Sequence, residues 1–509
     1  MPADNPADQP GDDQDVTELP SLEEVICILK QSGAKDIYEI LSLNQEEQDG
    51  KSSSTLRRLP RASRDGDENK ALRRLFDDFG IDEPPVHLQP GPQRRVHVIV
   101  STHSGTGLSL QFYNDILAPL LEAVGLTASE KPERGGAEQQ GSYHLLITQD
   151  ADSVKKFARE LSNWGRGEKN VEHTVVLLSG DGGIVDILNS YTSTDIDTVT
   201  SKDGVKPQSL PLIAVLPLGT GNALFNSLHK TVKTPAAASD VVQGLRTLLR
   251  GRATPLPSFK AVFPEGSRTI TYSEIVDPAP TGSVSTKQPD STPSLQEQAR
   301  RVTHLYGVVV ASYGFHSQLV WESDTPSYRQ HGAKRFQMVA QELLKESHAY
   351  RAAVEIARST SRAETTSTEK LDRERHAYIL ATPVSNLEKT FCISPASKPL
   401  DGQLRLVHFG PVDGAKTMEI MMAAYDGGKH VNMRWGATVV EGQSREEDID
   451  GVGYEDISEV RITTHEEDAR WRKVCIDGTI VEIPTGGCMV VSKETRQRLR
   501  VLVNESVVY

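Results

Sequence analysis

Residues 94–235 alternate between short, mainly apolar runs and longer segments with apolar residues at helical spacing. Runs with apolar residues at both odd and even positions are expected to be buried on both faces, which is typical of strands in a parallel sheet covered by helices on both sides. The predicted strands are 96–100, 143–148, 174–178 and 212–216, and the predicted helices are 110–124, 151–161 and 184–191. We therefore predict an α/β domain at 94–235.

After a predicted helix at 237–250, the pattern changes to short β-rich runs between turn residues, which continue as far as 501–503. Closely spaced short strands are typical of an antiparallel sandwich. We therefore predict a larger β-sandwich domain at 236–509. Polar stretches near 278–298 and 359–369 are predicted to be surface insertions in it.

Residues 1–93 are predicted to be an N-terminal tail, mostly disordered. Its acidic first 19 residues have almost no apolar surface to bury, so burial cannot offset the entropy lost on ordering. Apolar residues at helical spacing, such as Leu22, Val25, Ile26 and Leu29, predict short helices at about 21–43.

The composition narrows the kinds of partner. A net charge of -14 argues against a nucleic-acid partner. The four cysteines lie far apart, without the spacing of a zinc or disulfide framework, which suits reduced thiols in the cytoplasm. No stretch approaches the roughly 18 apolar residues of a membrane-spanning helix. We expect a cytoplasmic protein that touches membranes only transiently.

Three glycine-rich turns follow the first, third and fourth predicted strands, at 104–107, 179–183 and 217–222. Because the carboxyl ends of parallel strands lie at one edge of a sheet, these turns are expected to converge. Glycine lets backbone N–H groups approach phosphate oxygens, and each following helix adds its positive dipole end. A lone turn of this kind is more often only a tight connection, but three together predict a phosphate site.

The central turn also places a carboxylate, Asp181, among its glycines. A structural cap at such a position would more often be Asn or Ser. A carboxylate beside a phosphate site indicates a metal ion to bind or a proton to accept.

The sequences SGDGG at 179–183 and PLGTGN at 217–222 resemble the paired signatures of the diacylglycerol kinase catalytic domain superfamily. In the second half, ASYGF at 311–315, WES at 321–323 and YRQHGAKRF at 328–336 resemble the sphingosine kinase and ceramide kinase branch of that superfamily.

Two later motifs, DGQL at 401–404 and IDG at 476–478, fit the β-domain of the same superfamily. The resemblance covers about 94–508. It implies an ATP-NAD kinase-like fold with a nucleotide-binding domain at 94–235 and a lipid-binding sandwich at 236–509, and with the nucleotide held between them.

The resemblance implies an ATP-dependent lipid kinase that phosphorylates a hydroxyl of a sphingoid base, ceramide or diacylglycerol, with ATP and Mg²⁺ as cofactors. Asp181 is implied as the general base or the magnesium-organising carboxylate, and Asp186 as its catalytic support. The implied contacts to the nucleotide are Ser104, Gly105, Thr106, Gly107, Thr148, Gly180, Gly182, Gly183, Gly219, Thr220, Gly221, Asn222, Arg329, Arg335, Asp477 and Gly478. Without the resemblance, the two arginines would suggest only a solvated helix face.

The chain departs from the superfamily pattern in three places. Ser101-Thr102-His103 stands where the first loop usually begins with Asn-Pro. Thr479 stands where the last motif has Glu, so a carboxylate near the metal is missing unless Glu482 or another acid replaces it. The stretch 316–320 lacks the acidic residues with which sphingosine kinases suit a cationic amine, and this favours a neutral lipid.

Three interpretations follow. An active lipid kinase is favoured, with a membrane lipid as substrate and partner. The missing carboxylate and the altered first loop leave open a catalytically weakened scaffold that binds nucleotide or lipid. The α/β architecture also allows a kinase of a soluble substrate such as NAD. The sequence gives no indication of the oligomeric state.

Overall fold

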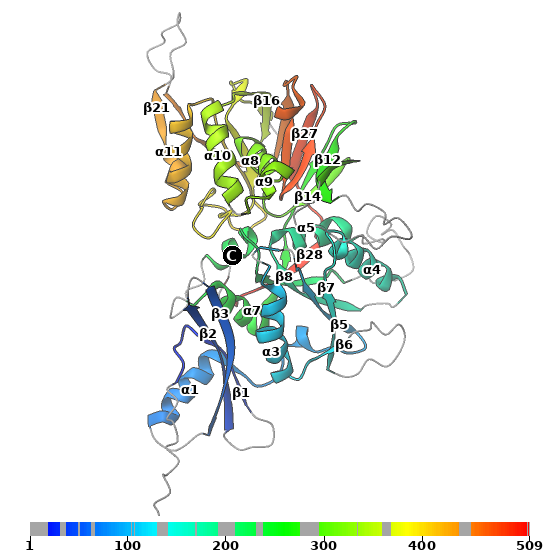
Figure 1. Ribbon diagram of the computed structural model, residues 1–509, viewed down its shortest axis with the longest axis vertical. Helices are drawn as coiled ribbons and strands as arrows, with labels where there is room; N and C mark the ends of the chain where they lie inside the picture. Colours follow the sequence, from blue (N-terminus) through cyan, green and yellow to red (C-terminus); the bar gives the residue numbers. More distant parts are fainter. Residues whose placement is uncertain are drawn as a thin grey trace, which may run out of the picture.

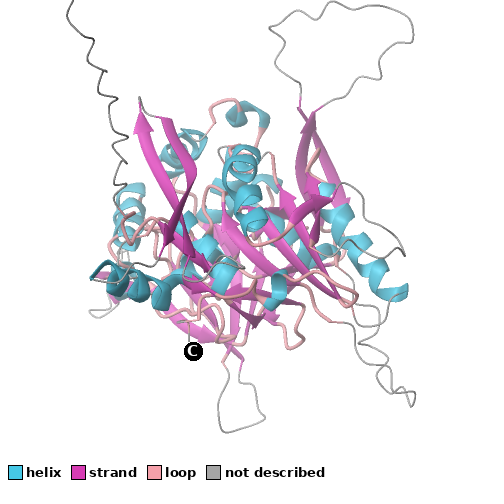
Figure 2. Ribbon diagram, turned by 90° about the horizontal axis from the view of Figure 1, so that it is seen from below, coloured by secondary structure: helices cyan, strands magenta, loops and turns pink. Residues whose placement is uncertain are grey.

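The computed structural model describes residues 19–30, 37–48, 51–62, 67–102, 104–105, 107–129, 141–167, 171–191, 209–230, 238–274, 295–332, 334–358, 368–436, 449–505 and 507. Figure 1 shows an N-terminal module in blue, an α/β domain in the middle and a β-rich domain at the other end. Figure 2 shows the molecule along its long axis, with helices in cyan and strands in magenta. No helix in these ranges combines the length and the apolar character needed to cross a membrane.

A seven-stranded sheet forms the centre of the α/β domain, in the order β10-β28-β9-β8-β5-β7-β6. Its strands are β5 (Arg94–Val100), β6 (Thr127–Ser129), β7 (Ser142–Ile147), β8 (Glu172–Ser179), β9 (Leu212–Pro217), β10 (Arg252–Leu256) and β28 (Leu499–Val503). The helical segments are α2 (Ser109–Phe112), the π-helical turn η2 (Tyr113–Leu117), α3 (Ala118–Ala123), α4 (Ser153–Gly167), α5 (Asp181–Ser190), α6 (Ala223–His229) and α7 (Asp240–Arg250). Strands β5 to β9 pair in parallel, which confirms the predicted α/β arrangement.

The central strand β8 is buried on both faces, as its apolar run predicts. Val175 and Leu177 belong to the core that contains Phe157 of α4. Val176 and Leu178 belong to the core that contains residues of α3 and α7 on the other face. Helices therefore cover both sides of the sheet.

The last strand of the chain, β28, belongs to the α/β domain. The prediction that all of 236–509 forms the sandwich domain is therefore wrong for this strand. β28 pairs in parallel with β9 and antiparallel with β10, so segments far apart in the sequence complete one sheet. The sequence pattern assigns 501–503 to the sandwich because a short apolar strand carries no information about which sheet it joins. Helix α7 and strand β10 also extend the α/β domain beyond residue 236.

The second domain consists mainly of two antiparallel sheets, which confirms the predicted sandwich. One follows the order β14-β11-β27-β24-β16-β17, with β18 also paired to β16, and the other β13-β12-β26-β25-β15-β19-β20-β23. The strands are β11 (Phe259–Val262), β12 (Arg268–Glu274), β13 (Leu295–Arg301), β14 (His304–Gly307), β15 (Ala311–Gly314), β16 (Tyr350–Ala357), β17 (Thr368–Lys370), β18 (Arg375–His376), β19 (Tyr378–Thr382), β20 (Leu404–Phe409), β23 (Gly453–Ile457), β24 (Glu459–Thr464), β25 (Lys473–Ile476), β26 (Thr479–Glu482) and β27 (Cys488–Lys493).

Helices flank this sandwich and a small hairpin extends from it. They are α8 (Phe315–Ser323), α9 (Pro326–Arg329), α10 (Lys334–Glu346), α11 (Gly414–Tyr425), η3 (Lys429–Asn432) and η4 (Ala469–Trp471), and the hairpin is β21 (Arg434–Gly436) with β22 (Ile449–Gly451). Most of the predicted insertions near 278–298 and 359–369 lies outside the described residues; the parts inside are in β13 and β17.

The N-terminal module is a sheet, and the prediction of short helices at 21–43 is wrong. The sheet has the order β3-β2-β1-β4, with β1 (Val25–Lys30), β2 (Ile37–Gln48), β3 (Lys51–Ala62) and β4 (Gly80–Ile81), beside helix α1 (Asp67–Phe79) and the turn η1 (Val86–Leu88). In β1, Val25 and Ile28 pack in the module's own core, while Ile26 and Cys27 pack in the core shared with the α/β domain. A run buried on both faces shows no period that separates strand from helix.

The described part of 46–70, predicted to be disordered, completes this hairpin and begins α1. The predicted disorder of residues 1–18 lies outside the described residues. The module is fastened to the α/β domain by Arg246 of α7, whose guanidinium donates to the carbonyl oxygens of Val25 at 2.8 Å and Leu22 at 2.6 Å. The same guanidinium lies 4.6 Å from the centre of the Phe79 ring.

Candidate active site

The three glycine-rich turns converge at the carboxyl edge of the parallel sheet, as the sequence predicts. The Gly180 N–H donates to Ser104 Oγ at 2.9 Å, which joins the first turn to the central one. A Cβ on Gly105 would lie 2.3 Å from the Leu218 carbonyl oxygen, and Gly105 also has a φ of +56°. A Cβ on Gly219 would lie 2.3 Å from Gly180 Cα. Glycine is needed here because the backbones themselves are in contact.

The third turn is shaped by the Asn222 side chain. Asn222 has a left-handed φ of 51°, and its Oδ1 accepts the Gly219 N–H at 2.9 Å. Its Nδ2 donates to the carbonyl oxygens of Gly219 at 3.0 Å and Pro217 at 3.3 Å. The side-chain amide of Asn222 therefore forms hydrogen bonds within the turn. The nucleotide contact expected of Asn222 would be made instead by the backbone of the turn that this side chain stabilises. Thr220 is exposed at the tip.

Asp181 lies where the central turn meets the third turn. It is the first residue of α5, and its carboxylate accepts two N–H groups at the start of α6, from Ala223 at 2.7 Å and Leu224 at 3.0 Å. Burial raises the pKa of Asp181, while the two N–H groups act in the opposite direction. These bonds fix the carboxylate and leave further lone pairs on both oxygens.

Asp477 approaches from the second domain, in the turn between β25 and β26. Its carboxylate accepts the N–H groups of Val308 at 2.6 Å, Val309 at 3.0 Å and Val310 at 2.5 Å. Burial raises the pKa of Asp477, the three N–H groups oppose this rise, and the charge of Asp181 adds a smaller increase; the resulting pKa is about 7. The carboxylate charge of the first domain therefore acts on that of the second.

Thr148 holds the beginning of the first turn. Its Oγ1 accepts the Thr102 N–H at 3.0 Å, and Thr102 Oγ1 donates to the Thr148 carbonyl oxygen at 2.9 Å. The sequence predicts a nucleotide contact for Thr148, and the structure gives it a buried position beneath the turn. Thr102 was missed as a partner, although its place just after the first strand is where such an anchor belongs. Thr106 lies outside the described residues.

Asp186 does not share the site of Asp181 in the way that the sequence analysis expects. Five residues along a helix place two side chains about 140° apart around its axis. Asp186 instead lies 3.7 Å from Lys155 of α4. Burial raises the pKa of Asp186 to about 6, and the Lys155 charge opposes this rise. No described contact links the two aspartates.

Arg329 and Arg335 lie together in the second domain, around Asp324. Arg329 makes a bidentate ion pair with the Asp324 carboxylate, with N–O distances of 2.7 Å and 2.9 Å, and also donates to the Tyr272 carbonyl oxygen. Arg335 lies 4.0 Å from the same carboxylate. Among the described residues, no contact joins either arginine to the glycine turns, so their expected role on the triphosphate would require a rearrangement.

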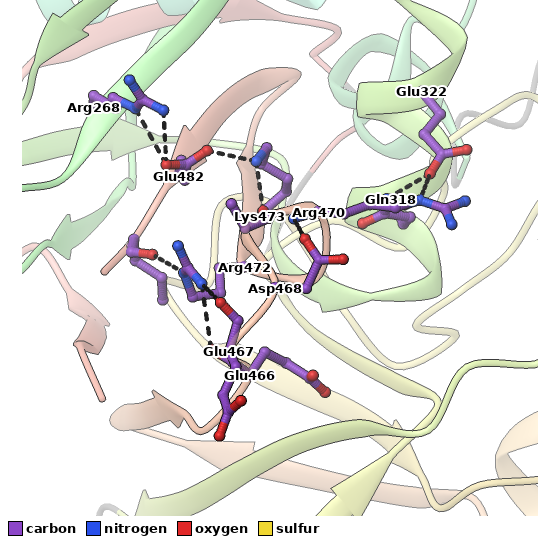
Figure 3. Close-up of polar contacts among 12 residues, drawn as sticks. Arg268, Gln318, Glu322, Glu466, Glu467, Asp468, Arg470, Arg472, Lys473 and Glu482 are labelled. Carbon is purple, nitrogen blue, oxygen red and sulfur yellow. Dashed lines mark hydrogen bonds and ion pairs between the residues drawn. The ribbon is translucent and has the colours of Figure 1, made fainter. Parts of the chain in front are cut away.

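Glu482 does not replace the carboxylate that is missing at Thr479. Figure 3 shows its two oxygens directed toward Lys473, at 2.6 Å, and Arg268, at 3.0 Å. Lys473 is buried and donates also to the Ala469 carbonyl oxygen. Glu482, on β26, is therefore occupied as the partner of the buried Lys473 on β25.

The remaining glycines of the site differ in how closely other atoms approach them. Gly183 is buried, and a Cβ there would lie 2.9 Å from Ser179 Oγ. Gly182 and Gly478 would meet nothing within 4 Å, and Gly107 and Gly478 have positive φ values of 76° and 86°. A Cβ on Gly221 would lie 3.0 Å from the Leu387 carbonyl oxygen, which brings the second domain against the third turn.

The donors at this junction fit a magnesium ion of the kind that nucleotide enzymes use. Mg²⁺ is usually held by one or two carboxylates together with substrate phosphates and water. Within the described ranges, no group of three or more histidine, cysteine or acidic side chains forms a complete cage. Asp181, which keeps lone pairs beyond the two N–H groups that it accepts, supplies one such carboxylate.

Glycine-rich turns that converge at the carboxyl edge of a parallel sheet, with a fixed carboxylate beside them, are typical of a phosphate-binding site. The family model described as the diacylglycerol kinase catalytic domain matches residues 95–252. This part of the chain is therefore similar to a diacylglycerol kinase catalytic domain, which supports a kinase function.

Two solved structures from Bacillus anthracis str. Sterne are similar to the chain. One, of a candidate diacylglycerol kinase, is 13% identical, with a TM-score of 0.43 over 81% of this chain and 98% of that one. The other, of a diacylglycerol kinase, is also 13% identical, with a TM-score of 0.41 and the same coverage. No curated protein matches by sequence.

Proposed function

We propose that the chain transfers the γ-phosphate of ATP to a hydroxyl of a membrane lipid. The observation that carries this proposal is the junction itself, where Asp181 is fixed between the central and third turns and its charge acts on Asp477 of the second domain. Phosphoryl transfer requires mainly positioning and charge compensation, and the junction offers both.

The nucleotide phosphates would lie over the three turns, with backbone N–H groups of the central and third turns as donors. The close backbone contacts around Gly180 and Gly219 keep this surface free of side chains. Mg²⁺, held by Asp181 with phosphate oxygens, would neutralise charge on the triphosphate. Asp181 would accept the proton of the lipid hydroxyl, for which a raised pKa is favourable.

The surroundings of α8 favour a neutral acceptor such as ceramide or diacylglycerol over a sphingoid base. Glu322 is an acid on α8, and its carboxylate already accepts from Gln318 Nε2 at 2.6 Å and Arg470 Nε at 2.9 Å (Figure 3). Burial lowers the pKa of His316 to about 4, so this side chain is neutral at pH 7. A lipid ammonium would thus find no unpaired carboxylate on this helix, and burying it unpaired is costly.

A second candidate is a protein that binds nucleotide and lipid with weakened catalysis. It is favoured by Thr479 together with the occupied state of Glu482, which leave the last motif without its carboxylate. Both candidates bind nucleotide and lipid, but only the first transfers phosphate at an appreciable rate.

The test is transfer of labelled phosphate from ATP with Mg²⁺ to ceramide, diacylglycerol and sphingosine in mixed micelles, with nucleotide binding measured alongside. The proposal expects one labelled neutral lipid at a rate well above the no-enzyme control. Nucleotide binding without any labelled lipid would reject the active kinase and leave the second candidate. Preferential labelling of sphingosine would reject the inference from α8.

A further inference from the structure

Helix α11 lies at the outer edge of the second domain, beside β21 (Figure 1). It begins at an Asp413 cap and buries Thr417, Ile420 and Ala424 against the domain. Its opposite face carries three large exposed side chains one and two turns apart, Met418 (42%), Met422 (56%) and Tyr425 (44%). We call this stripe the α11 ridge. Elsewhere in the described part of the chain, no helix or strand exposes more than one large apolar side chain to this degree.

The α11 ridge is continuous with the rim of the candidate active site. The Tyr425 ring lies 4.8 Å from the Phe391 ring, and Tyr425 Oη donates to Glu388 at 3.3 Å. The same segment of chain brings the Leu387 carbonyl oxygen against Gly221 of the third turn. It also bonds to α6, where the Asn386 N–H donates to Ser227 Oγ at 3.0 Å. One short segment thus connects the ridge to the phosphate edge.

The charges around the ridge are largely paired. Lys416 lies 2.9 Å from Glu419, and Lys429 lies 2.6 Å from Asp426. The Lys416 ammonium also lies 5.4 Å from the centre of the Trp435 ring. An anionic surface would find little free positive charge here, so apolar contact is the attraction that this face offers.

We propose that the α11 ridge is the surface with which this kinase contacts a lipid bilayer. Met418, Met422 and Tyr425 insert among the upper acyl chains, which places the rim of the third turn at the level of the headgroups. A bilayer is the occupant that fits, because the ridge is apolar, its flanking charges are neutralised, and it ends beside a site that needs a membrane lipid. This last point rests on the proposed function.

The test is flotation of the full chain with phosphatidylcholine vesicles that contain no acceptor lipid, with the double variant M418Q/M422Q beside wild type. Both methionines are exposed, so the variant is expected to fold, and glutamine keeps the length of the side chain. We expect its vesicle partition coefficient to fall at least about tenfold. Raising the salt concentration should change wild-type binding by less than about threefold. Val86→Gln, at a residue 63% exposed in η1, is the matched control and should bind as wild type does.

A second readout separates this proposal from the kinase proposal. M418Q/M422Q should phosphorylate a short-chain, water-soluble acceptor at the wild-type rate, because the ridge does not touch the turns. If no phosphate transfer is detected but flotation still depends on the α11 ridge, the kinase proposal is rejected and the lipid-contact proposal stands. Unchanged flotation of the variant, no flotation of wild type, or a wild-type dimer that becomes monomeric in the variant would each overturn the lipid-contact proposal, the last by making the ridge an interface between copies.

Discussion

Gly219→Ala is the substitution that the geometry of the turns forbids most clearly. The added Cβ would lie 2.3 Å from Gly180 Cα, 2.9 Å from Gly180 N and 2.8 Å from Asn222 Oδ1. Two of these atoms belong to backbone, so no side-chain rotation relieves the contact. To reach an ordinary separation, the central and third turns must move apart by about 1 Å.

A shift of this size should affect binding and catalysis more than folding. Overpacking of a rigid site costs about 1–3 kcal/mol of stability. A misplacement of about 1 Å in a catalytic arrangement costs on the order of 10²-fold in rate. The shift would also stretch the two bonds that the Asp181 carboxylate accepts from α6. We therefore expect weaker nucleotide binding and a roughly hundredfold slower phosphate transfer, measured by calorimetric titration and by the labelled-ATP assay.

Gly91→Ala is the matched control, from outside the three turns. A Cβ at Gly91 would meet nothing within 4 Å, and its φ is not positive. This variant should bind nucleotide and unfold as wild type does. If Gly219→Ala binds nucleotide with wild-type affinity, or if the two variants lose affinity equally, the close approach of the turns is not what forms the site.

The other predictions concern stability. Burial lowers the pKa of His173 to about 4, so the unfolded chain binds more protons than the folded one between pH 4 and 6.5. In urea unfolding, wild type should therefore gain stability relative to His173→Gln as the pH rises through this range, by up to about 1.4 kcal/mol per pH unit. A stability difference that does not change with pH would contradict this. Arg246→Met should lower the free energy of unfolding by about 1–3 kcal/mol, because it leaves two carbonyl oxygens without their donor. Limited proteolysis of this variant should cleave the N-terminal module first. First cleavage elsewhere would argue against the docking role of Arg246. Glu482→Gln should lower the free energy of unfolding by about 3 kcal/mol, because the buried Lys473 loses the negative charge that it is paired with, and kcat should change little. A lower kcat at wild-type stability would instead place Glu482 at the metal.

Much of the fold follows from local patterns, and the exceptions have physical causes. The strands β5, β7, β8 and β9 are predictable because runs apolar on both faces leave few alternatives to a covered parallel sheet. The strand β1 is not, because its consecutive buried residues have no period that separates strand from helix. The return of β28 to the first sheet is a pairing between residues nearly three hundred positions apart, about which a local pattern says nothing.

The candidate site shows the same division. Convergence of the glycine turns follows from strand order, and the sequence predicts it. The use of Asp181 as a cap for α6 is invisible, because its partners lie 42 and 43 residues away. The pairing of Arg329 with Asp324, five residues away, is a local feature that the charge pattern could have revealed.

The most direct test of the account is phosphate transfer by Asp181→Asn, beside Asp152→Asn as a surface control. Asn can accept one of the two α6 N–H groups, so the variant should remain folded with a loss of about 1 kcal/mol. If Asp181 accepts the proton and organises the metal at the junction, transfer to the lipid should fall by on the order of 10²–10⁴-fold while Asp152→Asn stays at the wild-type rate. Transfer by Asp181→Asn within about threefold of wild type would contradict the central claim that this carboxylate carries the chemistry.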